Sequence, residues 1–164
     1  MLPADALLGQ VVPPSQALLL RGDWKRSGVG VVCAAGRFDL LHPGHVRLLE
    51  QARDLGGILI AVVAAEDGDD PPSSSPITPP VERAEILAAL AAVDFAVELG
   101  TDGMDLAAFL TRLAPDVFVE GGPSDSATPI ARSLAAAHTK VVHIPLEPGY
   151  STGTILDRIT RPPA

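Results

Sequence analysis

The amino-acid sequence predicts an α/β protein in which five parallel strands form a doubly wound sheet with helices on both faces. After residue 28, short apolar, β-branched runs alternate with helical stretches. Strands that alternate with helices pair in parallel through right-handed crossovers, which place helices on both faces of the sheet. The 164 residues suffice for one domain with a single core, built mainly from Ala, Leu, Val and Ile.

The individual elements have their own signals in the sequence. The run 29–34 is apolar and β-branched, and Pro43 then opens a helix because its fixed φ suits the first turn. Val46 and Leu49 begin an apolar stripe with helical spacing. The predicted strands are 29–34, 58–65, 95–99, 116–120 and 140–145, and the predicted helices are 43–55, 81–92, 104–114, 129–138 and 152–160.

Two parts of the chain lie outside this alternation. Residues 1–28 form a predicted N-terminal extension to the domain of residues 29–164, and prolines interrupt their apolar stretches. The extension is either a short helix packed on the domain or a spacer. Residues 66–80 are acidic and then rich in Pro and Ser, which is typical of a loop, either a plain linker or a lid over a site.

The composition argues against several classes of partner and location. A net charge of −8 and a pI near 4.8 argue against nucleic acid, because affinity for a polyanion comes from Lys and Arg. There is neither a long apolar run nor a basic segment before an apolar stretch at the N-terminus. We therefore expect no membrane helix, no signal peptide and a cytoplasmic location. The single Cys33 allows no intrachain disulfide and is expected to be a small buried hydrophobe.

Three polar or glycine-containing segments follow the ends of predicted strands. They are residues 36–45, 120–123 and 149–154. In open parallel sheets, ligands bind beyond the carboxyl ends of the strands, where the strand order reverses. The sequence therefore predicts one ligand site at this edge of the sheet.

The run His42-Pro43-Gly44-His45 is typical of an anion site at the start of a helix. The N–H groups of Gly44 and His45 fall in the first turn, where we expect no intrahelical partner and a favourable helix dipole. Gly44 lacks a Cβ, so a ligand can approach the backbone. Both imidazoles can face the charge that develops in phosphoryl or nucleotidyl transfer. Two other interpretations stay open: ordinary cap or surface histidines, and metal ligands, although no Cys, His or carboxylate cluster joins them.

The pattern Gly36-x-Phe38-Asp39-x-x-His42-x-Gly44-His45 resembles the signature of the cytidylyltransferase-like nucleotidyltransferases. Residues 56–62, 80–94, 115–122 and 148–156 resemble that family's second strand, central helix, glycine loop and C-terminal Ser-Thr-Thr helix start. The nearest pattern is that of ADP-heptose synthases, the adenylyltransferases that act on D-glycero-β-D-manno-heptose 1-phosphate. Glycerol-3-phosphate and ethanolamine-phosphate cytidylyltransferases come next. The resemblance implies a Rossmann-like fold of the HIGH nucleotidyltransferase type.

The resemblance also implies an activity. ATP or CTP, bound with Mg²⁺, would give AMP or CMP to a sugar- or alcohol-phosphate and release pyrophosphate, and the protein would be a homodimer. His42 and His45 would be catalytic, through positioning and electrostatics, and no metal-ligating residue is assigned. The implied nucleotide-binding residues are Gly36, Arg37, Phe38, Asp39, Gly44, Arg83, Glu120, Gly121, Gly122, Tyr150, Ser151 and Thr152.

Several of these residues have structural interpretations as well. Asp39 either accepts from a backbone N–H or lies near Mg²⁺, and Phe38 is either core or a contact. Arg83 reaches either a phosphate or a surface carboxylate. The Gly121-Gly122 pair is either a close approach to base and ribose or an ordinary turn. Ser151 and Thr152 face a phosphate or only cap the last helix.

The chain departs from the usual pattern of that family where positive charge is expected. Residues 67–76 hold no Lys or Arg, and Glu120 stands where the resemblance implies Lys. A carboxylate at residue 120 would repel a sugar phosphate if it pointed into the site. These departures motivate a second hypothesis: a catalytically degenerate domain of the same fold that binds nucleotide weakly or assists in assembly.

Overall fold

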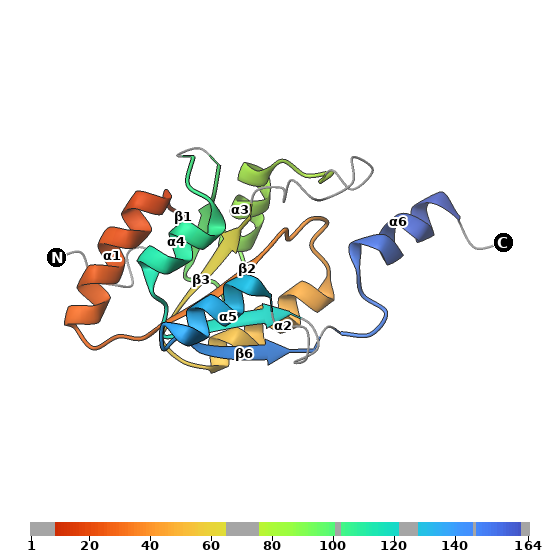
Figure 1. Ribbon diagram of the computed structural model, residues 1–164. Helices are drawn as coiled ribbons and strands as arrows, with labels where there is room; N and C mark the ends of the chain where they lie inside the picture. The colour runs from red at the N-terminus through yellow and green to blue at the C-terminus, as the bar shows by residue number, and fades with distance from the viewer. Residues whose placement is uncertain (1–8, 65–75, 101–102, 122–127, 146, 162–164) are drawn as a thin grey trace.

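Six parallel strands form one sheet in the computed structural model, which describes residues 9–64, 76–100, 103–121, 128–145 and 147–161 (Figure 1). In spatial order they are β1 (Gln10–Val11), β4 (Phe95–Glu98), β3 (Ile58–Val63), β2 (Val31–Gly36), β5 (Val117–Gly121) and β6 (Lys140–Ile144). The strand order runs outward from β2 in both directions, so it reverses between β2 and β5. This reversal marks the expected ligand site of an open α/β sheet.

Helices cover both faces of the sheet (Figure 1). One core cluster joins α1 (Pro14–Arg26), α4 (Leu106–Leu113) and α5 (Pro129–Ala136) to one face, and the other joins α2 (Pro43–Asp54) and α3 (Pro80–Ala88) to the opposite face. Alternate residues of β2 explain this division: Val31 and Cys33 belong to the first cluster, Val32 and Ala34 to the second. α6 (Thr152–Thr160) extends away from the sheet and contains no buried residue.

Most helix starts carry a recognisable signal. Pro occupies the first turn of α1, α2, α3 and α5, where its missing N–H costs nothing. Asp105, Thr128 and Ser151 cap α4, α5 and α6 by accepting the N–H groups of Ala108, Ala131 and Thr154. The Ser151 side chain thus has the capping role that the sequence left open.

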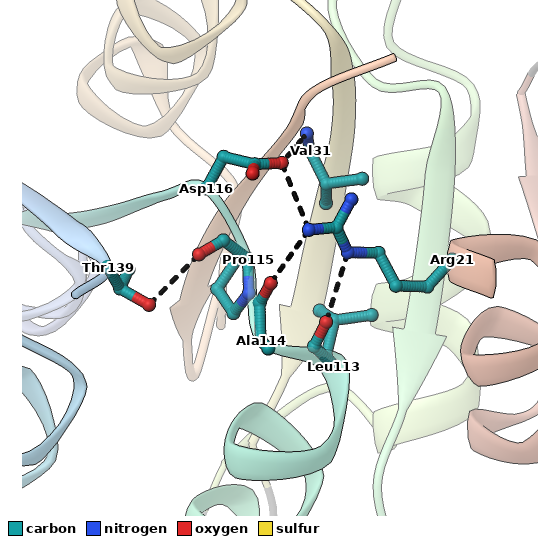
Figure 2. Close-up of polar contacts among 7 residues, drawn as sticks. All are labelled: Arg21, Val31, Leu113, Ala114, Pro115, Asp116 and Thr139. Atoms are coloured by element: carbon teal, nitrogen blue, oxygen red, sulfur yellow. Dashed lines mark hydrogen bonds and ion pairs between the residues drawn. The ribbon is translucent and has the colours of Figure 1, made fainter. Parts of the chain in front are cut away.

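A polar network ties α1 to the amino ends of the central strands (Figure 2). Arg21 is 9% exposed and donates to the carbonyl oxygens of Leu113 at 3.2 Å and Ala114 at 3.0 Å. It also pairs with Asp116 at 3.2 Å, whose carboxylate accepts the Val31 N–H at 2.7 Å. The described part of the predicted N-terminal extension therefore packs on the domain and supplies both a strand and a helix.

The structure confirms the α/β class and the parallel sheet with helices on both faces. The predicted number of five strands is wrong by one, because β1 pairs with β4 at the edge of the sheet. A strand of two exposed residues is too short to show alternation, so periodicity cannot detect it. Cys33 is buried as expected. None of the helices in the described ranges is long and apolar enough to cross a bilayer.

Candidate active site

The loop from β2 to α2 has a constrained backbone. Phe38 and Leu40 adopt φ values of +49° and +45°, a region that side chains with a Cβ visit rarely. Such strain persists only where the surroundings hold it, and it is typical of ligand-binding loops. Phe38 is also 6% exposed and packs in the core cluster of α2 and α3. The strained loop is therefore fixed to the core by its own aromatic ring.

Two imidazoles lie face to face at the start of α2. The ring centroids of His42 and His45 are 3.8 Å apart with an interplanar angle of 19°, and Phe38 lies 5.5 Å from His45. Both Nδ1 atoms are buried and have no hydrogen-bond partner among the described residues. Burial lowers the pKa of His42, while burial and the neighbouring His42 outweigh Asp39 and lower the pKa of His45 to about 4. Both rings are therefore neutral at pH 7.

The first turn of α2 is tighter than the sequence suggests. The His45 N–H donates to the His42 carbonyl oxygen at 2.9 Å, so the expectation that this N–H lacks a partner is wrong. Short bonds of this kind often close the first turn of a helix. Packing around Gly44 is tight: a Cβ there would lie 3.0 Å from the His42 ring and 3.2 Å from Cβ of Tyr150.

A cavity of about 530 Å³ opens beyond the carboxyl ends of β2 and β5, at the point where the strand order reverses. It combines residues from the loop after β2, from α2, from β5 and from the start of α6. Its walls are formed by Ala35, Gly36, Arg37, Phe38, Asp39, His45, Leu48, Ile77, Val119, Gly121, Thr152, Gly153 and Leu156. Seven of the residues named from the sequence thus share one cavity: Gly36, Arg37, Phe38, Asp39, His45, Gly121 and Thr152.

His42 lies beside this cavity and not in its wall. It lines a shallower hollow with Leu41, Pro43, Val46, Arg47 and Glu50. Its ring is stacked on that of His45, which does line the cavity. Tyr150 borders the same side: it packs against Gly44, and the Arg47 guanidinium lies 5.3 Å from its ring centroid.

Asp39 holds two segments together. Its carboxylate accepts the N–H groups of Ile77 at 2.9 Å and Thr78 at 3.0 Å, and its carbonyl oxygen accepts the Thr152 hydroxyl at 2.9 Å. Burial alone would raise the pKa of Asp39, but these backbone N–H groups and the charge of Arg83 lower it. Of the two roles left open for Asp39, the structure shows the backbone contact.

Arg83 is 1% exposed and lies beneath the loop that follows β2, because its guanidinium donates to the carbonyl oxygen of Arg37. It is therefore neither at the surface nor in the cavity wall. The sequence did not predict the burial of Arg83, because an Arg side chain is almost never fully buried unless it is paired.

Glu120 faces away from the cavity. Side chains alternate along a strand, so Val119 and Gly121 line the cavity while Glu120 points to the other side. There its carboxylate accepts the Thr128 N–H at 3.3 Å and lies 3.5 Å from Nδ1 of His143. The structure thus places the Glu120 side chain outside the wall of this cavity. Gly122 lies outside the described residues.

The apolar part of the wall was not found from the sequence. Leu48, Ile77, Val119 and Leu156 contribute to it, and Ile77 is 56% exposed despite its apolar side chain. Their spacing is that of ordinary core residues, so only the fold brings them together. An exposed apolar residue next to a polar motif is a weak signal that could have identified Ile77.

The described residues contain no group of three His, Cys, Asp or Glu side chains that could hold a metal ion. The cavity instead combines one cation, a neutral imidazole, backbone of the loop after β2 and an apolar wall. Such a combination can hold an anionic chain next to a flat apolar group. The cavity can therefore accommodate a phosphate ester that undergoes group transfer.

Comparison with known proteins agrees with this geometry. The family model described as cytidylyltransferase-like matches residues 33–156. The chain is 33% identical over 162 residues to the bifunctional protein HldE of Hyphomonas neptunium, covering 96% of this chain and 31% of that protein. With HldE of Methylococcus capsulatus it shares 37% identity over 169 residues, which is 95% of this chain and 35% of the relative. The chain therefore spans about a third of the length of these relatives.

Solved structures extend the likeness to three dimensions. The lipopolysaccharide core biosynthesis protein from Thermoplasma volcanium matches with a TM-score of 0.57 and 27% identity, over 73% of this chain and 98% of the other. Pantoate-beta-alanine ligase from Francisella tularensis has a TM-score of 0.62 over 85% of this chain and 68% of that one. Its 14% identity makes it evidence for the fold alone. Since the family model covers most of the chain and relatives share a third of its residues, the chain belongs to the cytidylyltransferase-like family.

Proposed function

We propose that this chain is a nucleotidyltransferase of the ADP-heptose-synthase type. It would transfer AMP, or CMP, from a nucleoside triphosphate to a sugar- or alcohol-phosphate and release pyrophosphate. The observation that carries this proposal is the cavity at the strand reversal, which brings Arg37, His45, Gly121 and Thr152 together from four separate segments. The name of one structural neighbour, a lipopolysaccharide core biosynthesis protein, supports a sugar-containing acceptor.

The reaction needs little proton chemistry from the protein. An oxygen of the acceptor phosphate forms a bond to the α-phosphorus, and the bond from that phosphorus to the bridging oxygen breaks, so that pyrophosphate leaves with the electron pair. The attacking oxygen is already an anion, so no general base is required. The protein's contribution is to align the two groups and to stabilise the charge that moves to the leaving oxygens.

The residues of the cavity can share this work. His45 and the first turn of α2 would face the phosphate chain, and Arg37 would add positive charge at the cavity wall. The apolar residues Leu48, Val119 and Leu156 suit a nucleobase or ribose. Asp39 would act indirectly, since it positions Ile77 and Thr152 at the cavity wall.

Mg²⁺ would enter with the nucleotide. The carboxylate of Asp39 already accepts two backbone N–H groups, and the described residues offer no cluster of metal ligands. A protein cage for the ion therefore does not fit these residues, whereas an ion carried on phosphate oxygens needs none. We assign no step of the reaction to it.

Pyrophosphate release tests the proposal. The chain is incubated with Mg²⁺ and either ATP or CTP, against a panel of sugar 1-phosphates and alcohol phosphates. We expect turnover with at least one pair, and we expect His45→Ala to reduce kcat/KM by about 10²–10³-fold. The matched control is His138→Asn, because His138 is exposed and has φ of +70°, which Asn tolerates. Thermal melting of both variants checks that they fold. Absence of turnover with every pair would contradict the proposal.

One observation favours the second hypothesis, a nucleotide-binding domain without turnover: His42 lies outside the cavity wall. That hypothesis predicts that a nucleotide raises the melting temperature while pyrophosphate release stays at background. It also predicts that His42→Ala barely changes the nucleotide's effect on melting. The active enzyme predicts turnover and its loss when the stack with His45 is removed.

A further inference from the structure

The stacked imidazoles form an unusual electrostatic unit. The rings of His42 and His45 face each other at 3.8 Å, and the Nδ1 atoms of both are removed from solvent without a partner among the described residues. Two imidazolium ions at this distance would repel each other strongly in a partly buried place. The start of α2 adds the positive end of a helix dipole beside them. Protonation of either imidazole is therefore disfavoured in the free protein.

A bound phosphate chain reverses this balance. It places several negative charges in the cavity whose wall contains His45. An opposite charge within about 4–6 Å favours the protonated form of an imidazole and raises its pKa by about 1–3 units. Protonation also turns a ring with one donor and one acceptor into a ring with two donors, which is what phosphate oxygens require.

We propose that in mildly acidic solution the His42–His45 stack takes up one proton from solvent when a phosphate chain binds, so that the pair is neutral in the free protein and singly charged in the complex. This inference rests on the proposed function. The proton moves from water to one imidazole nitrogen, and it returns to solvent when the last phosphate product leaves. A second proton is disfavoured because the rings remain stacked.

The surrounding charged and titratable groups do not remove this coupling. They come from the loop after β2, from α2, from α3 and from the segment before α6: Arg37, Asp39, Arg47, Glu50, Arg83, Glu147 and Tyr150. The carboxylates among them are engaged in part: Asp39 accepts backbone N–H groups, and Glu147 pairs with Arg47. Asp39 is the one carboxylate that raises the pKa of His45, and it is outweighed by burial and by His42.

The sign of the pH dependence follows from linkage. Binding takes up a proton, so affinity for the phosphate chain rises as the pH falls through the raised pKa of the complex, and it levels off below the pKa of the free stack. Burial lowers the pKa of His45 to about 4 in the free protein, and a phosphate chain raises it by about 1–3 units, so the rise in affinity is expected in mildly acidic solution.

Proton NMR of the histidine rings tests the inference directly. The whole chain contains four histidines, so their Cε1–H signals can be resolved. The variants His138→Asn and His143→Asn, at residues outside the cavity wall, identify two of the signals and leave the other two to the His42–His45 pair. The full chain is titrated between about pH 4 and pH 8, free and with saturating inorganic triphosphate and Mg²⁺. Adenosine serves as the uncharged control ligand. Reading the rings themselves avoids the protons that triphosphate releases or takes up on its own.

We expect the free protein to show His42 and His45 midpoints below the ordinary histidine value. Triphosphate should raise one of them by about one pH unit or more, while His138 and adenosine-treated samples stay unchanged. If the amides of residues 36–45 shift with triphosphate but both ring midpoints stay in place, proton uptake is wrong and the proposed binding site survives. If no amide shifts at saturating triphosphate, both the inference and the proposed function fail.

Discussion

The two ends of the sheet use their polar groups in opposite ways. At the amino end, the side chains are engaged with each other and with the backbone: Arg21 reaches two carbonyl oxygens and Asp116, and Asp116 accepts a backbone N–H (Figure 2). The Asp94 carboxylate is also engaged at this end: it accepts the N–H of Leu59, near the start of β3, at 2.7 Å and pairs with Arg53. Polar groups at this end stabilise the fold.

The carboxyl end differs in the loop after β2 and at the start of α2, although Asp39 is hydrogen-bonded there as well. Phe38 and Leu40 hold strained backbone conformations, and the Nδ1 atoms of His42 and His45 are buried without partners in the described chain. These features cost folding free energy. We infer that the polar groups at the amino end stabilise the fold and that those at the carboxyl end are available to a ligand.

The largest effect is expected at the amino end, from Gly57→Ala. Gly57 has φ of +87°, and a Cβ there would lie 2.3 Å from the carbonyl oxygen of Gly30, which accepts the Ile58 N–H. Backbone clash and strain together should lower the free energy of unfolding by about 3 kcal/mol or more, measured by urea denaturation. Gly56→Ala is the matched control: φ is +89° but the space is open, so we expect a loss of about 1–2 kcal/mol. Equal losses in the two variants would show that the contact with Gly30 is unimportant.

Arg21→Met should have the next largest effect. It removes the donors for the Leu113 and Ala114 carbonyl oxygens and leaves Asp116 without its partner. We expect a loss of about 2–3 kcal/mol in unfolding free energy and no change in nucleotide affinity of the folded protein. Arg26→Met removes a side chain that is 74% exposed and should cost less than about 0.5 kcal/mol. A weakened nucleotide affinity in Arg21→Met would contradict the separation of the two ends.

Asp39→Asn should affect function more than stability. The amide keeps the shape but loses the charge and one acceptor, so the wall at Ile77 and Thr78 loosens. We expect KM for the nucleotide to rise about tenfold with kcat changed less than about threefold, as measured by steady-state pyrophosphate release. Asp54→Asn, at the exposed end of α2, is the control.

The pH dependence of the same contact gives an independent check. The pKa of Asp39 is lowered from its ordinary value of 3.8 in the folded protein, so its contribution to stability is complete above that value and is lost only as the pH falls through the lower, folded pKa. Wild type and Asp39→Asn should therefore converge in stability only in strongly acidic solution. Convergence already at neutral pH would show that the charge of Asp39 does not matter.

The smallest effect is expected from Arg37→Gln. Arg37 is the one Lys or Arg side chain among the described residues of the cavity wall, and it is half-buried. We expect affinity for inorganic triphosphate, measured by calorimetry, to fall about five- to tenfold, and the loss to shrink at high salt. Arg112→Gln on α4 is the control because Arg112 is exposed and lies outside the cavity wall. Equal affinity in both variants would remove Arg37 from the phosphate site.

Much of the fold could be predicted because its signals are local. Apolar runs, Pro43 and the stripe through Leu49 each depend on neighbours in sequence, and they place the strands, the start of α2 and the site at the carboxyl edge. β1 could not be predicted, since its pairing with β4 joins segments about 85 residues apart and rests on two residues.

The arrangement inside the site was harder to predict because it depends on side-chain direction. The strand register decides that Val119 and Gly121 face the cavity and Glu120 does not, and a shift of one residue would have reversed this. The burial of Arg83 and the two backbone contacts of Asp39 depend on loops that meet only in the folded chain. Sequence patterns name the residue types, and tertiary packing gives each its role.

Amide chemical-shift mapping with ATP and Mg²⁺ tests the central claim most directly, because it reads both ends of the sheet in one experiment. We expect the perturbed amides to gather at residues 36–39, 45, 121 and 152–153, while those of Arg21, Asp94 and Asp116 stay in place. Perturbations centred on the amino end, or spread evenly over the sheet, would contradict it.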